Sequence, residues 1–428
     1  MDDPKKTVIK IMGLGGGGSN AVNRMIELGL EGVEFIAANS DAQALSHSLA
    51  PRKVQLGPKV TRGLGAGGKP EVGEAAAIES KADIREALEG ADLVFLTAGM
   101  GGGTGTGAIP VAAEVARSLG ALTVAVVTAP FTFEASRRQQ NAHTGLAKLR
   151  ANADTLVTVP NDKLLGLLPR QTTFEMSLRV ADEVLRQGVQ GLTELISKPG
   201  LINMDFANVR ALMQMAGPAM MAIGQGTGEH KATAAVRQAL QMPLLDLKSA
   251  HCATGVLVHF TGGEDLSLFE VSQAAAEITA AAPNAEVLFG ATIDPMLNGR
   301  TQVILVVTGI ETETMSPPKT DLSYHRPAAK AGPEPRPIVE APAEGELPLP
   351  AEPERSQPEV HLAEALFSQA VASSTLDHPL VVADSPNGDA RANGESRSVP
   401  AAAPAQASID MPAFLRRRRS LREYEEGN

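Results

Sequence analysis

The stretch Gly99-Met-Gly-Gly-Gly-Thr-Gly-Thr-Gly107 decides the fold. It follows the apolar run Asp92-Leu-Val-Phe-Leu-Thr-Ala98 and precedes an alanine-rich amphipathic segment, residues 108–119. This order predicts a buried strand, a glycine loop and a helix that opens from Gly105 onwards. Because glycine has no Cβ atom, several backbone N–H groups can converge on an anion at the positive end of the helix dipole. A flexible linker would not lie between a hydrophobic strand and a patterned helix, so we interpret the loop as a phosphate-binding site.

A second glycine loop lies near the N-terminus. Residues 13–20 read Gly-Leu-Gly-Gly-Gly-Gly-Ser-Asn, between a β-branched strand over residues 7–12 and an amphipathic helix over residues 21–30. The loop matches the G-x-G-x-x-G pattern of dinucleotide-binding folds. The next strand, residues 33–38, ends in Asn39-Ser-Asp41, where such folds carry a ribose-binding acid. A nicotinamide-dependent oxidoreductase is therefore an alternative interpretation.

A third glycine-rich stretch, residues 63–70, contains G-x-x-x-x-G-K. Pro70 stands where a P-loop needs Ser or Thr to hold Mg²⁺, and no buried strand runs into the stretch. We interpret it as a loop between a strand over residues 53–56 and one helix over residues 71–88. Lys69 is then a solvated side chain.

Strands and helices alternate as far as Pro160, with further strands over residues 122–127 and 155–159. This alternation predicts a mostly parallel sheet with helices on both faces, in which ligands bind at the carboxyl ends of the strands. The glycine loops, residues 39–41, Glu134 and Asn161 all fall at such ends.

The following segment has a different organisation. Apolar residues at three- and four-residue spacing predict one long helix over residues 175–198, ended by Pro199-Gly200. The next helix is predicted to be capped by Asp205. Strands over residues 255–260, 286–290 and 302–307, with a helix near residues 266–281, predict a smaller α+β domain. Methionines 213, 215, 220 and 221 are interpreted as core fillers.

Composition limits the possible functions of the 428-residue chain. The net charge of −11 argues against a nucleic-acid surface over the body of the protein. There is one cysteine, Cys252, and neither a signal-peptide pattern nor a long apolar run, so we expect a cytoplasmic protein without direct transmembrane insertion. After residue 310 lie 16 of the 29 prolines, which predicts a disordered tether. The tether ends in an apolar cluster, residues 409–415, followed by four arginines, residues 416–419.

Taken together, these motifs and Pro130-Phe-Thr-Phe-Glu134 closely resemble those of FtsZ, a family of bacterial division GTPases homologous to tubulin. The resemblance covers residues 7–310 and resumes at residues 409–415. It implies an α/β fold with a mostly parallel, Rossmann-like GTPase domain, a long central helix, a smaller α+β domain and a disordered C-terminal tail. The implied boundaries are 1–174 for the GTP-binding domain, 175–198 for the central helix, 199–310 for the α+β domain, 311–405 for the linker and 406–428 for the partner-binding peptide.

The resemblance also implies roles for individual residues. It assigns GTP or GDP and Mg²⁺ as ligands and leaves the metal-binding residues unknown. Asn161 and Asp182 would read the guanine edge, because an acid that accepts from the guanine N1–H and 2-amino group meets the wrong pattern in adenine. The implied nucleotide-contacting residues are Gly15, Gly16, Gly17, Gly18, Ser19, Asn20, Asn39, Asp41, Gly101, Gly102, Gly103, Thr104, Gly105, Glu134, Arg138, Asn161, Leu178 and Asp182. Alternatives remain: Asp182 as a solvated helix position, and Glu134 with Arg138 as an ordinary i,i+4 surface pair.

Two positions depart from the family pattern. Leu178 stands where the family usually has a phenylalanine that stacks on the base, and Phe174 lies one helical turn earlier on the same face. Asn208 stands where the family carries a second catalytic aspartate, whereas Asp205 is retained. Asp205 and Asn208 are the implied catalytic residues, in a loop at residues 203–208 that reaches the nucleotide of the neighbouring subunit. The alternative for Asp205 is a helix cap alone.

The sequence thus predicts a self-assembling GTPase that forms head-to-tail filaments at the mid-cell division ring. The alternative is a filament scaffold that binds nucleotide but hydrolyses it poorly. The resemblance predicts that the C-terminal peptide binds a membrane-anchoring division protein such as FtsA. Attraction of the four arginines to anionic lipid is the rival interpretation of the tail.

Overall fold

The computed structural model describes residues 7–166, 168, 169, 171–197, 200–202, 204–214, 217–245 and 251–310. The predicted tail, residues 311–428, lies outside the described residues. Ten strands form one sheet in the order β3-β2-β1-β4-β5-β6-β7-β10-β8-β9. No helix in the described part of the chain is long and apolar enough to span a membrane.

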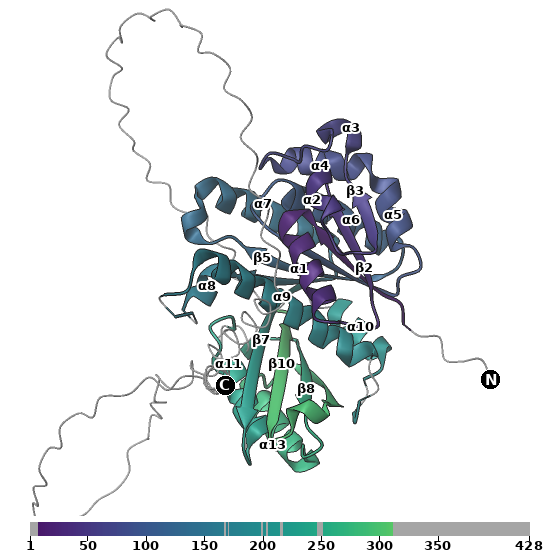
Figure 1. Ribbon diagram of the computed structural model, residues 1–428. Helices are drawn as coiled ribbons and strands as arrows, with labels where there is room; N and C mark the ends of the chain where they lie inside the picture. The colour runs from purple at the N-terminus through teal and green to yellow at the C-terminus, as the bar shows by residue number, and fades with distance from the viewer. Residues whose placement is uncertain are drawn as a thin grey trace, which may run out of the picture. The chain divides into compact units, whose positions relative to one another are not determined.

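The first six strands are parallel and confirm the predicted α/β fold (Figure 1). They are β1 (Ile9–Leu14), β2 (Glu34–Asn39), β3 (Arg52–Gln55), β4 (Leu93–Gly99), β5 (Leu122–Ala129) and β6 (Thr155–Pro160). Their order, 3-2-1-4-5-6, reverses direction between β1 and β4. In doubly wound sheets the ligand crevice opens at this reversal, outside the carboxyl ends of the two strands.

Helices cover both faces of this sheet because its strands are apolar on both sides. Ile11 packs toward the helices at residues 15–27 and 174–197, whereas the neighbouring Met12 packs with those at residues 70–79, 81–88 and 104–118. The elements are α1 (Gly15–Glu27), α2 (Ala42–Ser46), α3 (Pro58–Thr61), α4 (Pro70–Glu79), α5 (Lys81–Leu88), α6 (Thr104–Ser118), η1 (Thr132–Glu134), α7 (Ser136–Asn152), α8 (Asn161–Leu165) and α9 (Phe174–Ser197).

Two helix predictions were wrong at their boundaries. The single helix expected over residues 71–88 is α4 and α5, broken at Ser80. The Ser80 hydroxyl accepts from the Gly57 N–H and donates to the Gln55 carbonyl oxygen, which fixes a turn there. Helix α1 begins at Gly15, six residues before the predicted start, because the glycines that disfavour an isolated helix are packed against β4.

The described residues of the C-terminal half form four further strands and three longer helices. They are α10 (Phe206–Gln214), β7 (Gly217–Thr227), α11 (Lys231–Gln241), β8 (Gly255–Gly262), α13 (Leu268–Ala281), β9 (Glu286–Ile293), η2 (Pro295–Leu297) and β10 (Arg300–Thr308). Strand β7 and helix α11 were not predicted. The three glycines and the proline of β7 hide its strand pattern, yet Met221 is buried and Met220 packs against the core, as expected for core fillers. Met213 is also buried, and Met215 lies outside the described residues.

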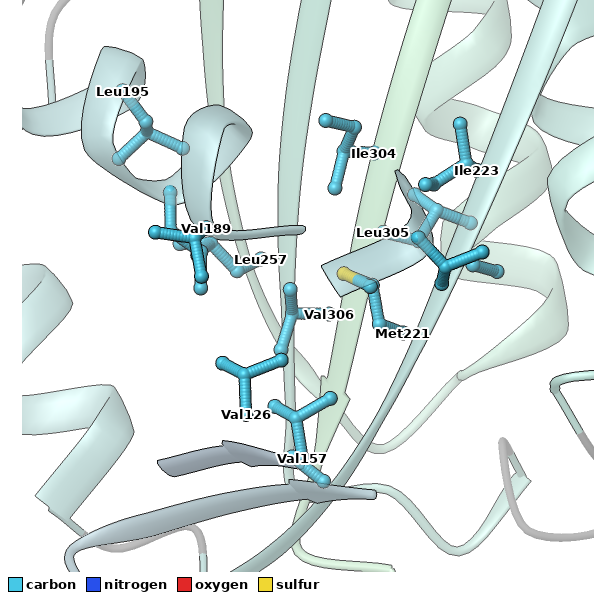
Figure 2. Close-up of a cluster of buried hydrophobic side chains, with 14 of the residues drawn as sticks. Val126, Val157, Val189, Leu195, Met221, Ile223, Leu257, Ile304, Leu305 and Val306 are labelled. Atoms are coloured by element: carbon cyan, nitrogen blue, oxygen red, sulfur yellow. The ribbon is translucent and has the colours of Figure 1, made fainter. Parts of the chain in front are cut away.

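The predicted long helix, α9, packs between the two halves. Figure 2 shows one buried cluster in which Val189 of α9 lies near Leu257 and Val306 of the C-terminal strands, and which also contains Leu195 of α9 and Val126 and Val157 of the parallel strands. Glycines let α9 approach closely: a Cβ atom on Gly191 would lie 2.2 Å from Cδ1 of Ile304. In the sheet itself, β6 pairs with β7 through only three residue pairs, 155–157 with 217–219.

Gly224 of β7 provides a test of this packing. A Cβ atom there would lie 2.0 Å from the backbone oxygen of Ala235 in α11, so α11 has to move away from the sheet. We expect Gly224→Ala to lower the free energy of unfolding by about 1–3 kcal/mol. Gly166→Ala is the matched control, because its nearest neighbour would lie at an ordinary 3.6 Å. Thermal unfolding of both variants is the measurement, and equal melting temperatures would contradict the close contact.

Candidate functional site

The two predicted phosphate loops meet at the reversal point of the sheet. A Cβ atom on Gly15 would lie 2.7 Å from the backbone nitrogen of Gly105, and one on Gly17 would lie 3.2 Å from that of Gly99. The first turns of α1 and α6 therefore lie against each other. Only residues without a side chain allow this approach at Gly15, where φ is also +68°.

The N-termini of α1 and α6 are arranged for an anion. Neither helix has a side-chain cap or an acidic residue in its first turn. A Cβ atom on Gly16 or Gly102 would meet nothing within 4 Å, so the loops border open space. Uncapped N–H groups and two positive dipole ends converge there, which is the arrangement that binds phosphate groups.

Buried polar atoms support a ligand in this space. Ser19 and Asn161 are each 5% exposed, yet neither Ser19 Oγ nor Asn161 Oδ1 has a hydrogen-bond partner among the described residues. Burial of an unpaired polar atom is costly, so a ligand that pairs with such atoms gains affinity. The glycine cradle and these two atoms fit a nucleotide at the carboxyl edge of β1, β4 and β6.

The predicted residues that follow β2 lie beside this cradle. The hydroxyl groups of Ser40 and Thr104 are 2.5 Å apart. Asn39 Oδ1 accepts from the backbone N–H of Asp41, and Asp41 Oδ1 accepts from that of Ala44 at 3.0 Å. The carboxylate of Asp41 is thus the N-cap of α2, which is a structural role in addition to the predicted one.

The third glycine-rich stretch forms a wall of the same region. It is a loop, as predicted, and Lys69 is exposed. A Cβ atom on Gly103 would lie 2.8 Å from the Cβ of Ala66 and 2.9 Å from the backbone nitrogen of Lys69. The loop at residues 62–69 therefore packs directly on the phosphate loop at residues 101–103.

Glu134 and Arg138 form an i,i+4 ion pair at 2.8 Å, the contact given above as the alternative, and their role in nucleotide binding stays a prediction. The Glu134 carboxylate also accepts from the Phe131 N–H at 2.8 Å, and Arg138 remains half exposed. Between them, Ala135 has φ +80°, a conformation that L-residues other than glycine rarely adopt and that often marks functional segments. The backbone of Arg138 abuts Gly101, so this pair borders the phosphate loop.

Asp182 of α9 faces α1 rather than open solvent. Its Oδ2 atom lies 3.6 Å from Arg24 Nε, and its side chain is 20% exposed. Burial raises the pKa of the Asp182 carboxyl from 3.8 to about 7, although the nearby Arg24 and Arg179 guanidinium groups lower it. The alternative of a solvated helix position is therefore wrong for Asp182.

Arg24 was missed by the sequence analysis. It lies one helical turn after Asn20 on α1, and this spacing is the signal that could have identified it. Leu178, one turn before Asp182 on α9, is 36% exposed. The side chain of Phe174, the other candidate for base stacking, lies outside the described residues.

Asp205 and Asn208 follow the far end of the central helix α9, which separates them from Asp182 and the glycine loops. From Asp182 to the end of α9 the helix runs about 22 Å. Asp205 caps α10, as predicted: its Oδ1 atom accepts from the Ala207 N–H at 3.1 Å. Both Asp205 and Asn208 are exposed. A catalytic role for these two side chains thus requires a nucleotide held by another copy of the chain.

No group of three or more His, Cys, Asp or Glu side chains is placed to hold a metal within the described part of the chain. Mg²⁺ in phosphoryl-transfer sites is usually held by one or two protein groups together with substrate phosphates. The site therefore fits a Mg²⁺ ion that enters with a nucleotide better than a metal held by protein ligands alone.

Comparison with known proteins identifies the family. Residues 8–169 match the model of the GTPase domain of the Tubulin/FtsZ family, and residues 217–311 match the FtsZ family C-terminal domain. The chain is 50% identical over 310 residues to the cell division protein FtsZ of Rickettsia conorii, covering 72% of this chain and 69% of that protein. Among solved structures it resembles an empty FtsZ dimer from M. jannaschii, with a TM-score of 0.68, 47% identity, and coverage of 71% of this chain and 89% of that one.

A more distant structure shows the same fold. CetZ2 from Haloferax volcanii, solved as a GTPγS-bound protofilament, has a TM-score of 0.63 at 21% identity and covers 71% of this chain and 94% of that one. The nicotinamide alternative is thereby excluded, because both halves of the chain match one family of GTPases. The chain belongs to the FtsZ family, the tubulin-related GTPases of bacterial cell division.

Proposed function

We propose that GTP and its Mg²⁺ bind in the cradle between α1 and α6, and that hydrolysis requires a second copy of the chain. The observation that carries this proposal is the contact of two uncapped helix N-termini, Gly15 against Gly105, beside the unpaired Ser19 hydroxyl. Backbone N–H groups of both loops would hold the phosphates, and bound Mg²⁺ would offset their negative charge.

The guanine base would lie between α1 and α9. Asp182 and the unpaired Asn161 Oδ1 are the acceptors that we assign to its edge, with Arg24 holding the Asp182 carboxylate in place. The ribose side is assigned to Glu134 and Arg138, which would exchange part of their mutual ion pair for contacts with the nucleotide. Leu178 would supply an apolar contact with the base in place of an aromatic ring.

Self-association is supported by exposed apolar side chains at the end of the C-terminal half that carries Asp205. Leu268, Phe269 and Met296 are 69%, 71% and 88% exposed. The loop before Asp205 is joined to the same end of the sheet, since Ile202 pairs with Ala291 near the end of β9. Apolar side chains this exposed are typical of a surface that is covered by another protein.

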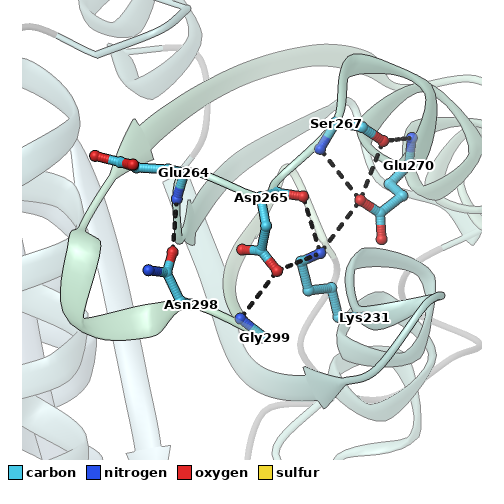
Figure 3. Close-up of polar contacts among 7 residues, drawn as sticks. All are labelled: Lys231, Glu264, Asp265, Ser267, Glu270, Asn298 and Gly299. Atoms are coloured by element: carbon cyan, nitrogen blue, oxygen red, sulfur yellow. Dashed lines mark hydrogen bonds and ion pairs between the residues drawn. The ribbon is translucent and has the colours of Figure 1, made fainter.

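A buried cation stabilises this surface (Figure 3). Lys231, 4% exposed, lies 3.2 Å from Asp265 Oδ2 and 3.4 Å from Glu270 Oε2. Asp265 in turn accepts from the Gly299 N–H at 2.9 Å. Lys231 thus ties the start of α11 to the two loops that precede Leu268 and follow Met296, which keeps the apolar side chains in place.

We therefore propose a head-to-tail filament in which Asp205 and Asn208 of one copy meet the nucleotide of the next. Phe133, in the segment that follows β5, is 60% exposed, and Leu64, which pairs with Asp41, is 83% exposed. Both side chains would face the exposed apolar side chains of the incoming copy. The empty M. jannaschii FtsZ dimer, 47% identical to this chain, supports self-association. Assembly at a mid-cell ring would follow from this mode of association.

The first test uses the pH dependence of nucleotide binding. Asp182 must be ionised to accept from guanine, and its pKa is about 7, so we expect the GTP dissociation constant to fall about tenfold from pH 6 to pH 8. ATP should bind at least tenfold more weakly than GTP, because its edge leaves the acceptor unpaired. Titrations with fluorescent nucleotides at fixed ionic strength measure both effects.

Asp182→Asn is the control for ionisation of the nucleotide itself, and its weak GTP binding should vary little with pH. Folding stability should change with pH in the opposite direction to GTP affinity. Because the pKa of Asp182 is raised in the folded state, its contribution to the free energy of unfolding is present below pH 4 and is lost as pH rises toward 7. A GTP affinity that is equal for both proteins at pH 8 would exclude Asp182 from the base site.

The second test concerns catalysis at the interface. An amide at position 208 can orient water but cannot take up its proton, so we expect slow hydrolysis and long-lived filaments, as in the weak-hydrolysis alternative. Asn208→Asp should raise phosphate release per subunit by roughly tenfold or more. Turnover should also rise steeply with protein concentration, because one copy completes the site of another.

Asp205→Asn separates catalysis from capping. Asparagine is as good an N-cap as aspartate, so α10 should remain stable while turnover is lost and GTP binding is retained. Phosphate release is measured against protein concentration for all three proteins. The proposal of an active site shared between two copies would be contradicted if Asn208→Asp leaves the rate of phosphate release unchanged and Asp205→Asn hydrolyses GTP normally.

The third test concerns the tail, whose residues lie outside the described structure. We propose that residues 409–415 bind a groove on a membrane-anchoring division protein such as FtsA, with the preceding tether setting the reach. Deleting residues 409–415 while keeping Arg416–Arg419 should abolish recruitment of the protein to FtsA-coated vesicles. Recruitment that persists on anionic vesicles would instead support direct attraction of the arginines, worth about 1 kcal/mol for each charge.

A further inference from the structure

Asn141, in the second turn of α7, contacts two loops that are distant in sequence. Its side-chain Nδ2 donates to the carbonyl oxygen of Gly101 and to that of Gly68, each at 3.2 Å. Gly101 belongs to the phosphate loop and Gly68 to the wall loop, residues 62–69. One amide group therefore joins both loops to the same helix.

The two hydrogen bonds of Gly101 determine where its neighbours point. Its N–H donates to the buried Thr106 hydroxyl at 2.8 Å, and its carbonyl oxygen accepts from Asn141. With φ at +97°, Gly101 can be held in this way only because it has no side chain. Both of its polar groups are thus used within the protein, and the N–H groups of Gly102 and Gly103 remain for a ligand.

Helix α7 is a rigid support for this contact. A Cβ atom on Gly145, one turn after Asn141, would lie 2.4 Å from Cγ2 of Thr106 and 2.9 Å from Cε of Met100. The helix is therefore packed closely on α6 and on the start of the phosphate loop. The wall loop is rich in glycine, with Gly63, Gly65, Gly67 and Gly68 all at positive φ, so an external contact lowers the number of conformations open to it.

We propose that Asn141 is a positioning residue that holds the wall loop and the phosphate loop together as one preformed site for the triphosphate. Asn141 itself does not touch the reacting atoms. It acts through the backbone of Gly101 and Gly68, which lowers the ordering cost that nucleotide binding would otherwise carry. This inference rests on the proposed GTP site.

Asn141→Ala removes both hydrogen bonds, and Asn141→Asp replaces the donor by a carboxylate of the same shape that faces two carbonyl oxygens. We expect the GTP dissociation constant of unassembled protein to rise about tenfold for Asn141→Ala and further for Asn141→Asp. Asn141→Gln keeps the donor on a half-buried side chain and should recover part of the affinity.

Thr144→Ala is the matched control on the same helix, because the exposed Thr144 hydroxyl donates only to the Gln140 carbonyl oxygen and neither loop. The variants are compared by fluorescent GTP binding at protein concentrations too low for assembly, and by phosphate release at high concentration. A positioning role predicts a raised KM for GTP with kcat at saturating GTP unchanged, and melting temperatures of the nucleotide-free proteins close to that of the wild type.

Two outcomes would overturn the inference. One is a GTP affinity of Asn141→Asp equal to that of the wild type; the other is a lowered melting temperature with unchanged affinity, which would mean a structural role alone. Wild-type protein that fails to bind GTP would instead contradict the proposed function, so the two failures are distinguishable.

Discussion

The contact between the first turns of α1 and α6 is the constraint on which the rest of the site depends. Gly15 approaches Gly105 and Gly18 approaches Thr97 at distances that leave no room for a Cβ atom. These contacts bring two helix dipoles to one point at the reversal of the strand order. Other groups assigned to the nucleotide are placed by elements that pack against one of these two helices: Asp182 lies on α9, which packs on α1, and Arg138 lies on α7, which packs on α6.

Helix α9 separates the residues that we assign to nucleotide binding from those that we assign to catalysis. Its first half carries Asp182, which α1 partly covers, and its far end leads to Asp205 and the exposed α10 terminus. A helix cannot shorten, so the two sets of side chains stay apart within one chain. In the proposed function the active site would therefore be complete only where two copies meet, and activity would report on assembly.

The parts of this structure that were predictable are those in which local pattern and tertiary packing agree. The strand before Gly99, the amphipathic α9 and the cap at Asp205 follow from periodicity and residue chemistry. The start of α1 was mispredicted because glycine disfavours helix in isolation, whereas close packing on β4 requires it there. Strand β7 was missed for a related reason, since Gly224 and Gly226 are needed by the backbone of α11 and interrupt the apolar pattern.

The parts of the candidate site that lie within a sequence motif were predictable. The parts formed by contacts between distant segments were not. Both glycine loops follow buried strands and could be read directly. The ion pair of Arg24 with Asp182 joins α1 to α9, and no spacing rule connects positions so far apart in the chain. The elevated pKa of Asp182 arises from burial between helices, which is a property of packing and not of the carboxyl group's neighbours in sequence.

The narrow junction between β6 and β7 has a mechanical consequence. Three residue pairs join the parallel strands to the C-terminal strands, and the other contacts described between the halves come from side chains of α9 and from α10, where Arg210 donates to the Gly120 carbonyl oxygen and Thr155 donates to that of Met213. A backbone ladder resists sliding because a shift of one residue reverses every side chain, whereas packed side chains tolerate small shear movements. Tension applied between the two halves would therefore be carried mainly by side-chain contacts, with α9 as a helix that packs on strands of both halves. This makes the central helix the element whose stiffness sets how far one half can tilt against the other before the junction opens.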